Sequence, residues 1–533
     1  MKTYDFIIVG GGTAGCVLAE RLSASGRHQV LVVEAGGDPR SPWISIPAGF
    51  SKLLVNPRYN WNFRTVPEPG TGDRTIAVPR GKGLGGSSLI NGMIYVRGQP
   101  ADYDAWGATG VTGWSYRDVE PVFRRIENYA QPGDDPARGR DGPLHLMEVR
   151  ERFPITDAFL QAAGQAGHAP NADYNGASQE GVGYYQVTQR DGRRWSAYDA
   201  YLKPALGRAN LHIARHARVL RLELDGTRCT GVTYLQDGVE HRAVAAKETV
   251  LCAGSVQSPQ LLELSGIGQP ALLERLGIAT RHALPGVGEN YIDHFATRVN
   301  WRVANTVTLN EMARGWRLGL AVSRYLARRR GILTLGTGLV HAFVKTRPEL
   351  PTPDAQFFVV HASYANAAER ILDTWPGMTI GVSQLRPKSV GSIHAQSARI
   401  DDAPAIRPNF LDCAEDRECL VGAMKVAREI MAQPAMAPFA IQETSPGPGT
   451  RSDAEWLAFA RANGQTIYHP IGTCSMGTGA RAVVDERLRV HGLAGLRVVD
   501  ASVIPSMVSG NIQGAVMVVA EKGAAMLLED NLA

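Results

Sequence analysis

A glycine-rich turn near the start of the chain constrains the fold more than any other feature of the sequence. The turn, Gly10 to Gly15, follows an apolar segment over Asp5 to Gly10 and precedes a helix-like segment over about Ala14 to Ser25. A second apolar segment, 30–33, ends at Glu34. Strand, turn, helix and strand within about 35 residues predict a βαβ unit with parallel strands.

The spacing of the glycines predicts a dinucleotide site at this turn. Gly10 allows the sharp bend, Gly12 lets the backbone approach a pyrophosphate, and Gly15 permits close packing of helix on strand. The phosphates would lie over the helix N-terminus, where unpaired backbone N–H groups attract anions. Glu34 would accept hydrogen bonds from ribose hydroxyls and repel a 2′-phosphate. The motif suits NAD and FAD alike, so it leaves the cofactor open.

Composition excludes several classes of protein. A net charge of +5 over 533 residues argues against a nucleic-acid partner, which needs a concentrated basic face. The six cysteines show no metal-ligand spacing, so we expect reduced thiols, no bound metal and a cytoplasmic protein. The N-terminal residues lack the pattern of a secretory signal. We find no apolar run of the about 18 residues that span a bilayer.

Further segments resemble the glucose–methanol–choline (GMC) oxidoreductases. GKGLGGSSLIN at 81–91 and GSVQSPQLLELSGIG at 254–268 look like the two signatures of that family. LPGVGEN at 284–290 also matches, and the segments 468–473 and 499–511 resemble the family's active-site region. Together with the first turn, these motifs extend in the right order over nearly the whole chain. The resemblance therefore implies an enzyme that oxidises CH–OH groups with FAD.

The same pattern predicts an α/β fold of two domains. The C-terminal 70 residues again contain an apolar strand-like segment followed by a turn and an apolar helix-like segment, as the N-terminus does. The segment 300–460 contains less glycine. We expect a discontinuous Rossmann-type FAD-binding domain with an inserted α+β substrate-binding domain. The FAD-binding domain would take 1–155, 196–295 and 465–533, and the substrate-binding domain would take 156–195 and 296–464.

The loop 85–88 offers consecutive backbone N–H groups and two hydroxyls, which suit an anion or a flat ring. The resemblance places this loop over the FAD pyrophosphate and the pyrimidine side of the flavin, with Asn91 and Gly92 near the flavin N5. A serine-rich loop that caps a helix is the plainer alternative. In some family members a histidine just before this asparagine bonds covalently to the flavin. Ile90 occupies that position here, which predicts dissociable FAD.

The resemblance also implies the other FAD contacts. Val219 would meet the adenine, and Asp500 with Ala501 would lie near the diphosphate and ribityl chain. Gln513 stands where the family usually has asparagine, which leaves its flavin contact open. The predicted FAD-binding residues are Gly10, Gly12, Thr13, Ala14, Gly15, Glu34, Ala35, Arg80, Gly83, Gly85, Gly86, Ser87, Asn91, Gly92, Met93, Ile94, Val219, Ala253, Gly254, Ser258, Tyr468, Asp500, Ala501 and Gln513.

His469 is the predicted catalytic base. Oxidation of an alcohol requires a group that takes the hydroxyl proton as hydride leaves the carbon for flavin N5, and an imidazole titrates in the efficient range. In the family, the histidine of the matching His-Pro segment has this role. Asn511 aligns with the second active-site position, where an amide can donate to the substrate oxygen but cannot share proton transfer. A turn-forming role after Gly510 is the alternative for Asn511.

Sequence gives a weaker prediction of the substrate. Gapless alignment of 331–346 with the choline-binding segment of the family puts Leu339 at a glutamate position. A buried cation without a counter-charge is costly, so we expect a neutral primary alcohol, aliphatic or aryl, rather than choline. Leu339, Phe358 and Tyr468 are the predicted substrate-pocket residues, although core packing explains such side chains equally well.

The segment 312–330 combines arginines with apolar residues. Its arginines are Arg314, Arg317, Arg324, Arg328, Arg329 and Arg330. We expect a solvated helix that covers the substrate domain. The alternative is a basic amphipathic helix that makes peripheral contact with the inner face of a membrane and passes electrons to quinone.

Three functions remain open. The first is an FAD-dependent alcohol dehydrogenase that passes electrons to a quinone-like or dye acceptor. The second is an alcohol oxidase of the same family that uses oxygen and makes hydrogen peroxide. The third is a non-catalytic flavin-binding protein.

Overall fold

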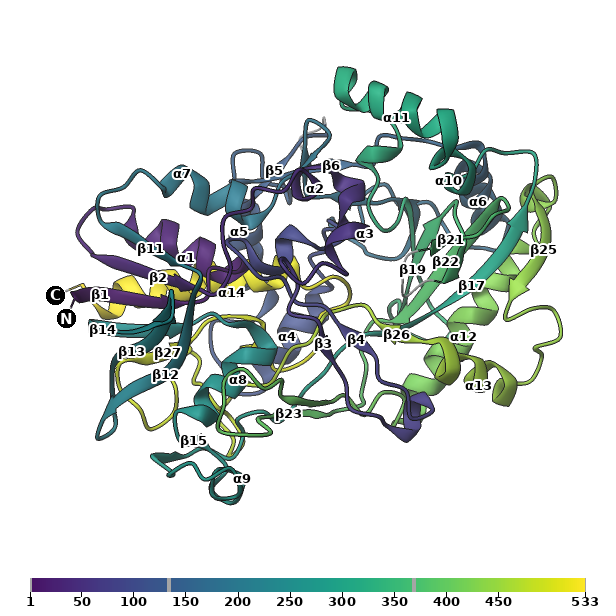
Figure 1. Ribbon diagram of the computed structural model, residues 1–533. Coiled ribbons are helices and arrows are strands. Elements are labelled where there is room, and N and C mark those ends of the chain that lie inside the picture. The colour runs from purple at the N-terminus through teal and green to yellow at the C-terminus, as the bar shows by residue number, and fades with distance from the viewer. Residues whose placement is uncertain (1, 132–135, 367–370, 533) are drawn as a thin grey trace.

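The computed structural model describes residues 2–131, 136–366 and 371–532. Two seven-stranded sheets, each with its own hydrophobic core, form the body of the molecule (Figure 1). This arrangement confirms the predicted α/β class.

The first sheet combines strands from three distant parts of the chain. Its strands are β1 (Lys2–Val9), β2 (Val30–Glu34), β11 (Leu211–Arg215), β12 (Ala217–Asp225), β13 (Arg228–Gln236), β14 (Val239–Leu251) and β27 (Leu496–Val498). The order β11-β2-β1-β14 is parallel, β27 pairs in parallel with β14, and β13 and β12 extend the sheet by antiparallel pairing. All of β2 is buried and apolar up to its final glutamate, as expected for an interior parallel strand.

Helices from both ends of the chain cover this sheet. Helix α1 (Thr13–Ser23) packs against α14 (Gln513–Asp530), and α8 (Gly254–Leu264) contacts β12 (Figure 1). Strand β14 runs without a break from Val239 to Leu251 and has two main partners. Its first half pairs with β13 and its second half with β1. The strand therefore continues from one partner to the other.

The second sheet is antiparallel throughout. Its strands are β7 (Gly181–Tyr184), β17 (Phe295–Val303), β18 (Val340–Val344), β19 (Ala355–Val360), β22 (Gly377–Gln384), β25 (Ala440–Ser445) and β26 (Gln465–Thr466), in the order β25-β17-β22-β19-β18-β7 with β26 beside β17. Helix α12 (Ala414–Met431) packs on β22, β17 and β19, and it also contacts α6 (Pro154–Gln165) and α13 (Asp453–Asn463). Helices α10 (Leu309–Met312) and α11 (Gly315–Arg328) lie at an outer edge of this half of the molecule (Figure 1).

Shorter helices and strands lie outside the two seven-stranded sheets. They are α2 (Pro42–Ser45), α3 (Phe50–Leu53), α4 (Pro100–Ala108), α5 (Tyr116–Ile126), α7 (Lys203–Ala205), α9 (Pro270–Arg275), β3 (Phe63–Arg64), β4 (Ala77–Val78), β5 (Glu127–Tyr129), β6 (Leu144–Glu148), β8 (Gln186–Val187), β9 (Gln189–Arg190), β10 (Arg193–Arg194), β15 (Ile267–Gly268), β16 (His282–Ala283), β20 (Tyr364–Asn366), β21 (Ile371–Leu372), β23 (Ser392–His394) and β24 (Ala405–Arg407). Among the described residues, no helix has both the length and the apolar character needed to cross a membrane. The exact domain limits stay predictions.

Candidate active site

A cavity of about 290 Å³ lies where the two sheets meet. A smaller hollow of about 90 Å³ adjoins it and reaches Glu34 and Val219. The two share the wall residues Gly12, Gly81, Gly86, Cys252, Ala253 and Gln257. The two spaces therefore lie next to each other, and together their walls extend from the first glycine turn of the chain to its C-terminal segments.

The glycine turn is held in shape by Glu34. One carboxylate oxygen accepts a hydrogen bond from the backbone N–H of Gly11 at 2.7 Å, and the other accepts from Gly36 at 2.7 Å and Gly83 at 3.0 Å. Gly10 has a φ of +103°, and a Cβ there would lie 2.5 Å from the carbonyl oxygen of Cys252. Glu34 thus joins the turn to the loop that begins at Gly81, a role that the sequence motif did not reveal.

The walls of the cavity fit a flat, polar cofactor. Gly254 lines the cavity with a φ of +81°, and a Cβ at this position would meet no atom within 4 Å. Within the described residues, the buried Gln513 Nε2 and Thr297 Oγ1 have no hydrogen-bond partner, although both side chains line the cavity. Buried polar atoms are rarely left without a partner in a folded protein, so these groups are suited to contact a bound molecule.

Asp500 organises the start of α8. Its Oδ2 accepts from the Gly254 N–H at 2.9 Å and from the Ser258 hydroxyl at 2.6 Å, and its Oδ1 accepts from the Ser502 N–H at 2.8 Å. Burial raises the pKa of this carboxyl, while the hydrogen bonds from Ser258 and Ser502 oppose that shift. Asp500 lines the cavity, whereas Ser258 lies behind it and supports Asp500.

Two histidines meet at the other end of the cavity. The His469 Nδ1 lies 3.0 Å from the His294 Nδ1, and the His294 Nε2 lies 2.8 Å from the carbonyl oxygen of Leu385. Burial lowers the pKa of His294 to about 4. The pKa of His469 falls well below 6.5, chiefly through burial and then through His294 and Arg80. Both imidazoles are therefore neutral at pH 7.

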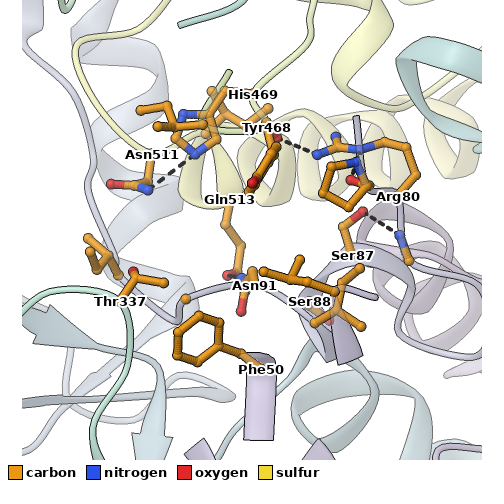
Figure 2. Close-up of a pocket in the computed structure, with 18 of the residues that line it drawn as sticks. Phe50, Arg80, Ser87, Ser88, Asn91, Thr337, Tyr468, His469, Asn511 and Gln513 are labelled. Carbon is orange, nitrogen blue, oxygen red and sulfur yellow. Dashed lines mark hydrogen bonds between the residues drawn. The ribbon is translucent and has the colours of Figure 1, made fainter. Parts of the chain in front are cut away.

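These partners determine the tautomer of each ring. A carbonyl oxygen only accepts, so the neutral His294 donates from Nε2 to Leu385 and offers a lone pair at Nδ1. His469 must then donate from Nδ1, which leaves the lone pair on its Nε2. That atom faces Asn511, whose Nδ2 lies 3.1 Å away (Figure 2). The basic nitrogen of His469 therefore points to Asn511, and both residues line the cavity.

A network from the second sheet orients Asn511. The Gln356 Nε2, on β19, donates to the Asn511 Oδ1 at 3.2 Å and to the Tyr185 hydroxyl at 2.9 Å. With its oxygen engaged in this way, Asn511 turns its N–H groups to His469 and the cavity. An amide in this position donates a hydrogen bond to an oxygen that enters beside the imidazole.

The backbone before His469 is fixed by the buried Asp293 and the half-buried Arg80. Asp293 accepts from the His469 N–H at 2.8 Å and from the Thr466 hydroxyl, and burial raises its pKa to about 6. Arg80 donates to the carbonyl oxygen of Tyr468, a residue with a φ of +74°. Burial lowers the pKa of Arg80. Asp293 and Arg80 together hold the His469 ring against the cavity.

Asn91 and Gln513 face each other from opposite ends of the chain. The Asn91 Nδ2 donates to the Gln513 Oε1 at 2.7 Å, and the Asn91 Oδ1 accepts from Arg194 at 2.5 Å (Figure 2). Thr337 packs against Gly92, where a Cβ would lie 2.1 Å from the Thr337 hydroxyl oxygen. The replacement of the family's usual asparagine by Gln513 is therefore accommodated by a direct contact with the loop 81–91.

The structure brings most of the predicted site residues together. Those that line the main cavity are Gly12, Thr13, Ala14, Arg80, Gly86, Ser87, Asn91, Gly92, Met93, Ile94, Ala253, Gly254, Phe358, Tyr468, His469, Asp500, Ala501, Asn511 and Gln513. Those in the adjoining hollow are Gly10, Gly12, Glu34, Ala35, Gly86, Val219 and Ala253. Gly15, Gly83, Gly85 and Ser258 lie behind these walls, where they shape the turn and loop.

The position of Leu339 differs from the prediction. Leu339 is only 1% exposed and packs in the core of the second sheet instead of lining the cavity. Its N–H donates to Val359 on β19, so its place is set by strand pairing. Thr337, two residues earlier, lines the cavity. Gapless alignment therefore chose the wrong residue for the wall.

The sequence reasoning missed the residues that hold His469 and Asn511 in place. Asp293, His294 and Gln356 belong to no recognised motif, and each acts through a contact with a residue distant in the chain. A buried polar residue at the start of β17 or in β19 was the available signal, but by itself such a residue does not indicate a site.

Comparison with known proteins decides the family. The family model described as GMC oxidoreductase matches residues 4–296 with its N-terminal part and 387–520 with its C-terminal part. The chain belongs to the GMC oxidoreductase family. It is 39% identical to mouse mitochondrial choline dehydrogenase over 98% of this chain and 89% of that protein. It is 38% identical to the alcohol dehydrogenase [acceptor] of Pseudomonas putida over 98% of this chain and 96% of that protein.

Solved structures of GMC oxidoreductases have the same fold. Pyridoxine 4-oxidase from Mesorbium loti superposes with a TM-score of 0.88 at 32% identity, and 98% of each chain is covered. A formate oxidase variant from Aspergillus oryzae, studied for modification of its FAD, gives a TM-score of 0.92 at 26% identity, with 100% of this chain and 99% of that chain covered. This GMC oxidoreductase is accordingly an FAD-binding flavoprotein and an enzyme that acts on CH–OH groups.

Proposed function

We propose that this GMC oxidoreductase oxidises a neutral primary alcohol to an aldehyde, with His469 as the base and Asn511 as the hydrogen-bond donor to the substrate oxygen. The observation that carries the proposal is the convergence of the His469 Nε2 and the Asn511 Nδ2, 3.1 Å apart, at the cavity. A substrate hydroxyl that replaces this contact meets both groups at once.

His469 is suited to accept the hydroxyl proton. Its Nε2 carries the lone pair because His294 accepts the hydrogen bond from Nδ1. Its lowered pKa keeps the ring neutral, and thus ready to act as a base, at neutral pH. Asn511 would support the substrate oxygen as it loses its proton. When bound, FAD supplies the group that accepts the hydride.

The residues that would hold FAD line the two adjoining spaces. The hollow beside Glu34 and Val219 suits the adenosine end, and the turn at Gly12 suits the diphosphate because its N–H groups lie at the N-terminus of α1. Asn91 and Gln513 would contact the flavin. Ile90 lines the cavity and has no nucleophilic atom, so the cofactor should be released by acid denaturation.

Charge on the cavity wall supports a neutral substrate. The charged side chains among its described lining residues are Arg80, Arg298 and Asp500. Asp500 already accepts hydrogen bonds from Gly254, Ser258 and Ser502, which leaves no carboxylate to balance a substrate cation. Phe358 and Val360 add apolar surface. We therefore favour an aliphatic or aryl alcohol over choline, although choline dehydrogenases are among the relatives.

For the electron acceptor we propose a quinone-like carrier, or a dye in the assay. The relative from Pseudomonas putida is described as an alcohol dehydrogenase [acceptor]. The solved relatives described as oxidases support the alternative of oxygen and hydrogen peroxide. Parallel assays of dye reduction and peroxide formation with the same alcohol distinguish these acceptors.

Anaerobic mixing of the yellow holoprotein with a panel of alcohols tests the proposal directly. Neutral primary alcohols should bleach the flavin absorbance, and choline at the same concentration should bleach it far more slowly. If choline were the fastest substrate, the argument from wall charge would be wrong. If none of the alcohols bleached the flavin, a non-catalytic flavoprotein would be the better description.

A further inference from the structure

Helix α11 exposes a cluster of large apolar side chains. Trp316 is 75% exposed, Leu326 66% and Leu320 60%, and Leu318 and Val322 are exposed as well. Five of the sixteen exposed large hydrophobic side chains among the described residues lie on this one helix. Single exposed apolar residues are ordinary, but a cluster of them marks a surface that another body covers.

Near its C-terminal end, the helix is attached to the molecule by Tyr325 and Arg324. Tyr325 is 1% exposed, and its hydroxyl donates to the carbonyl oxygen of Gly192 at 3.2 Å. Arg324 lies 3.5 Å from Glu151. Surface helices normally turn their apolar side chains to the core, whereas those of α11, a helix at the edge of the molecule (Figure 1), are exposed.

Basic side chains surround the C-terminal end of α11. Three hollows adjoin one another in this surface: one shares Arg150 and Arg330 with the second and Arg329 with the third. Besides the buried Arg194, eight cationic and three acidic side chains line these hollows: Arg150, Arg190, Arg193, Lys203, Arg324, Arg328, Arg329 and Arg330, with Glu151, Asp191 and Asp199. The surface beside the apolar cluster therefore suits an anionic partner.

We propose that α11 is an interfacial helix that binds an anionic membrane surface. Its 14 residues make a helix of about 21 Å, which lies along the membrane and does not cross it. Trp316, Leu320 and Leu326 enter the boundary between headgroups and acyl chains, and the neighbouring arginines pair with lipid phosphates.

Charge favours a membrane over a second copy of the chain. A symmetric contact between two α11 helices would bring two basic surfaces together, because Arg314 and Arg317 flank one end of the helix and Arg328 to Arg330 the other. Like charges across an interface oppose association. An anionic bilayer satisfies both the apolar cluster and the arginines.

Cosedimentation of the holoprotein with vesicles tests the proposal. At low salt, most of the protein should pellet with vesicles of phosphatidylcholine and phosphatidylglycerol. A much smaller fraction of the protein should pellet with vesicles of pure phosphatidylcholine. The triple variant W316S/L320S/L326S should bind about tenfold more weakly or worse. The control V239S/V390S/I441S, which removes apolar side chains exposed elsewhere by 57%, 46% and 58%, should bind like the wild type.

Two further variants test the charges. R328Q/R330Q should weaken binding by about 25-fold, at about fivefold for each arginine. R117Q/R399Q, at positions whose side chains are 91% and 74% exposed, should change it little. Brominated acyl chains should quench tryptophan emission in the wild type and far less in W316F.

Three results would overturn the proposal. The first is a wild-type protein that stays in the supernatant with anionic vesicles at low salt. The second is a W316S/L320S/L326S variant that binds as well as the control. The third is a wild-type dimer in sedimentation velocity that this variant dissociates, which would assign the face to a second copy. None of these measurements depends on the reaction that the enzyme catalyses.

Discussion

The contact between His294 and His469 leads to the sharpest prediction. Replacement of His294 by phenylalanine removes the acceptor for the His469 Nδ1–H, which lies 3.0 Å away in a buried site. The other tautomer, with its proton on Nε2 and no lone pair toward the substrate, then becomes accessible. We expect the variant to fold and bind FAD but to reduce the flavin more slowly.

The magnitude follows from the cost of the lost partner. A buried donor without an acceptor costs about 1–3 kcal/mol, and each 1.36 kcal/mol corresponds to a tenfold change in rate. If this cost applies to the reactive tautomer, flavin reduction should slow by about 5- to 150-fold. Stopped-flow absorbance under anaerobic conditions, at saturating alcohol, measures that rate constant without interference from the electron acceptor.

A second variant separates positioning from general disruption. His294→Asn keeps an acceptor oxygen near the position of the imidazole Nδ1 and should recover part of the rate. FAD content and thermal midpoint serve as controls for folding in both variants. A His294→Phe enzyme that folds, binds FAD and reduces it at the wild-type rate would refute the tautomer argument.

The remaining predictions concern the base and the cofactor turn. His469→Ala should stay yellow while flavin reduction slows by about 10²-fold or more; near-normal reduction would remove His469 from the mechanism. Burial lowers the His469 pKa, so the rate of flavin reduction should be constant above about pH 7 and fall only at lower pH. An inflection of this rate between pH 7 and 8 would contradict a base that is neutral at pH 7. Glu34→Gln loses one charged hydrogen bond to Gly11 and should weaken FAD binding about 10- to 150-fold, measured by equilibrium dialysis against the wild type; unchanged affinity would exclude the structural role of the carboxylate.

Local motifs explain what could be predicted from the sequence. The spacing of the glycines from Gly10 to Gly15 predicts a strand before the turn and a helix and a second strand after it. β1, α1 and β2 form at these places. His469 and Asn511 were identified by short segments that carry their context with them. For such residues, neighbours in the chain supply most of the information.

Residues that act across the junction of the two sheets could not be found in this way. His294 lies 175 positions from the histidine it contacts. Gln356, in the second sheet, reaches Asn511 in the loop before α14. Leu339 was misplaced because strand pairing, and not distance along the chain, decides which residue lines the cavity. For α11, the sequence showed arginines among apolar residues but not which side of the helix is attached to the molecule.

The three hydrogen bonds to the Glu34 carboxylate have a consequence for assembly. Since these bonds join the turn at Gly11 to Gly36 and Gly83 through the protein's own atoms, the cradle for the diphosphate is already shaped before any nucleotide arrives. Stripped protein should consequently regain its colour by simple uptake of FAD, without refolding. Because the same bonds hold the loop that begins at Gly81 against the turn, the Glu34 carboxylate should also slow the release of bound FAD.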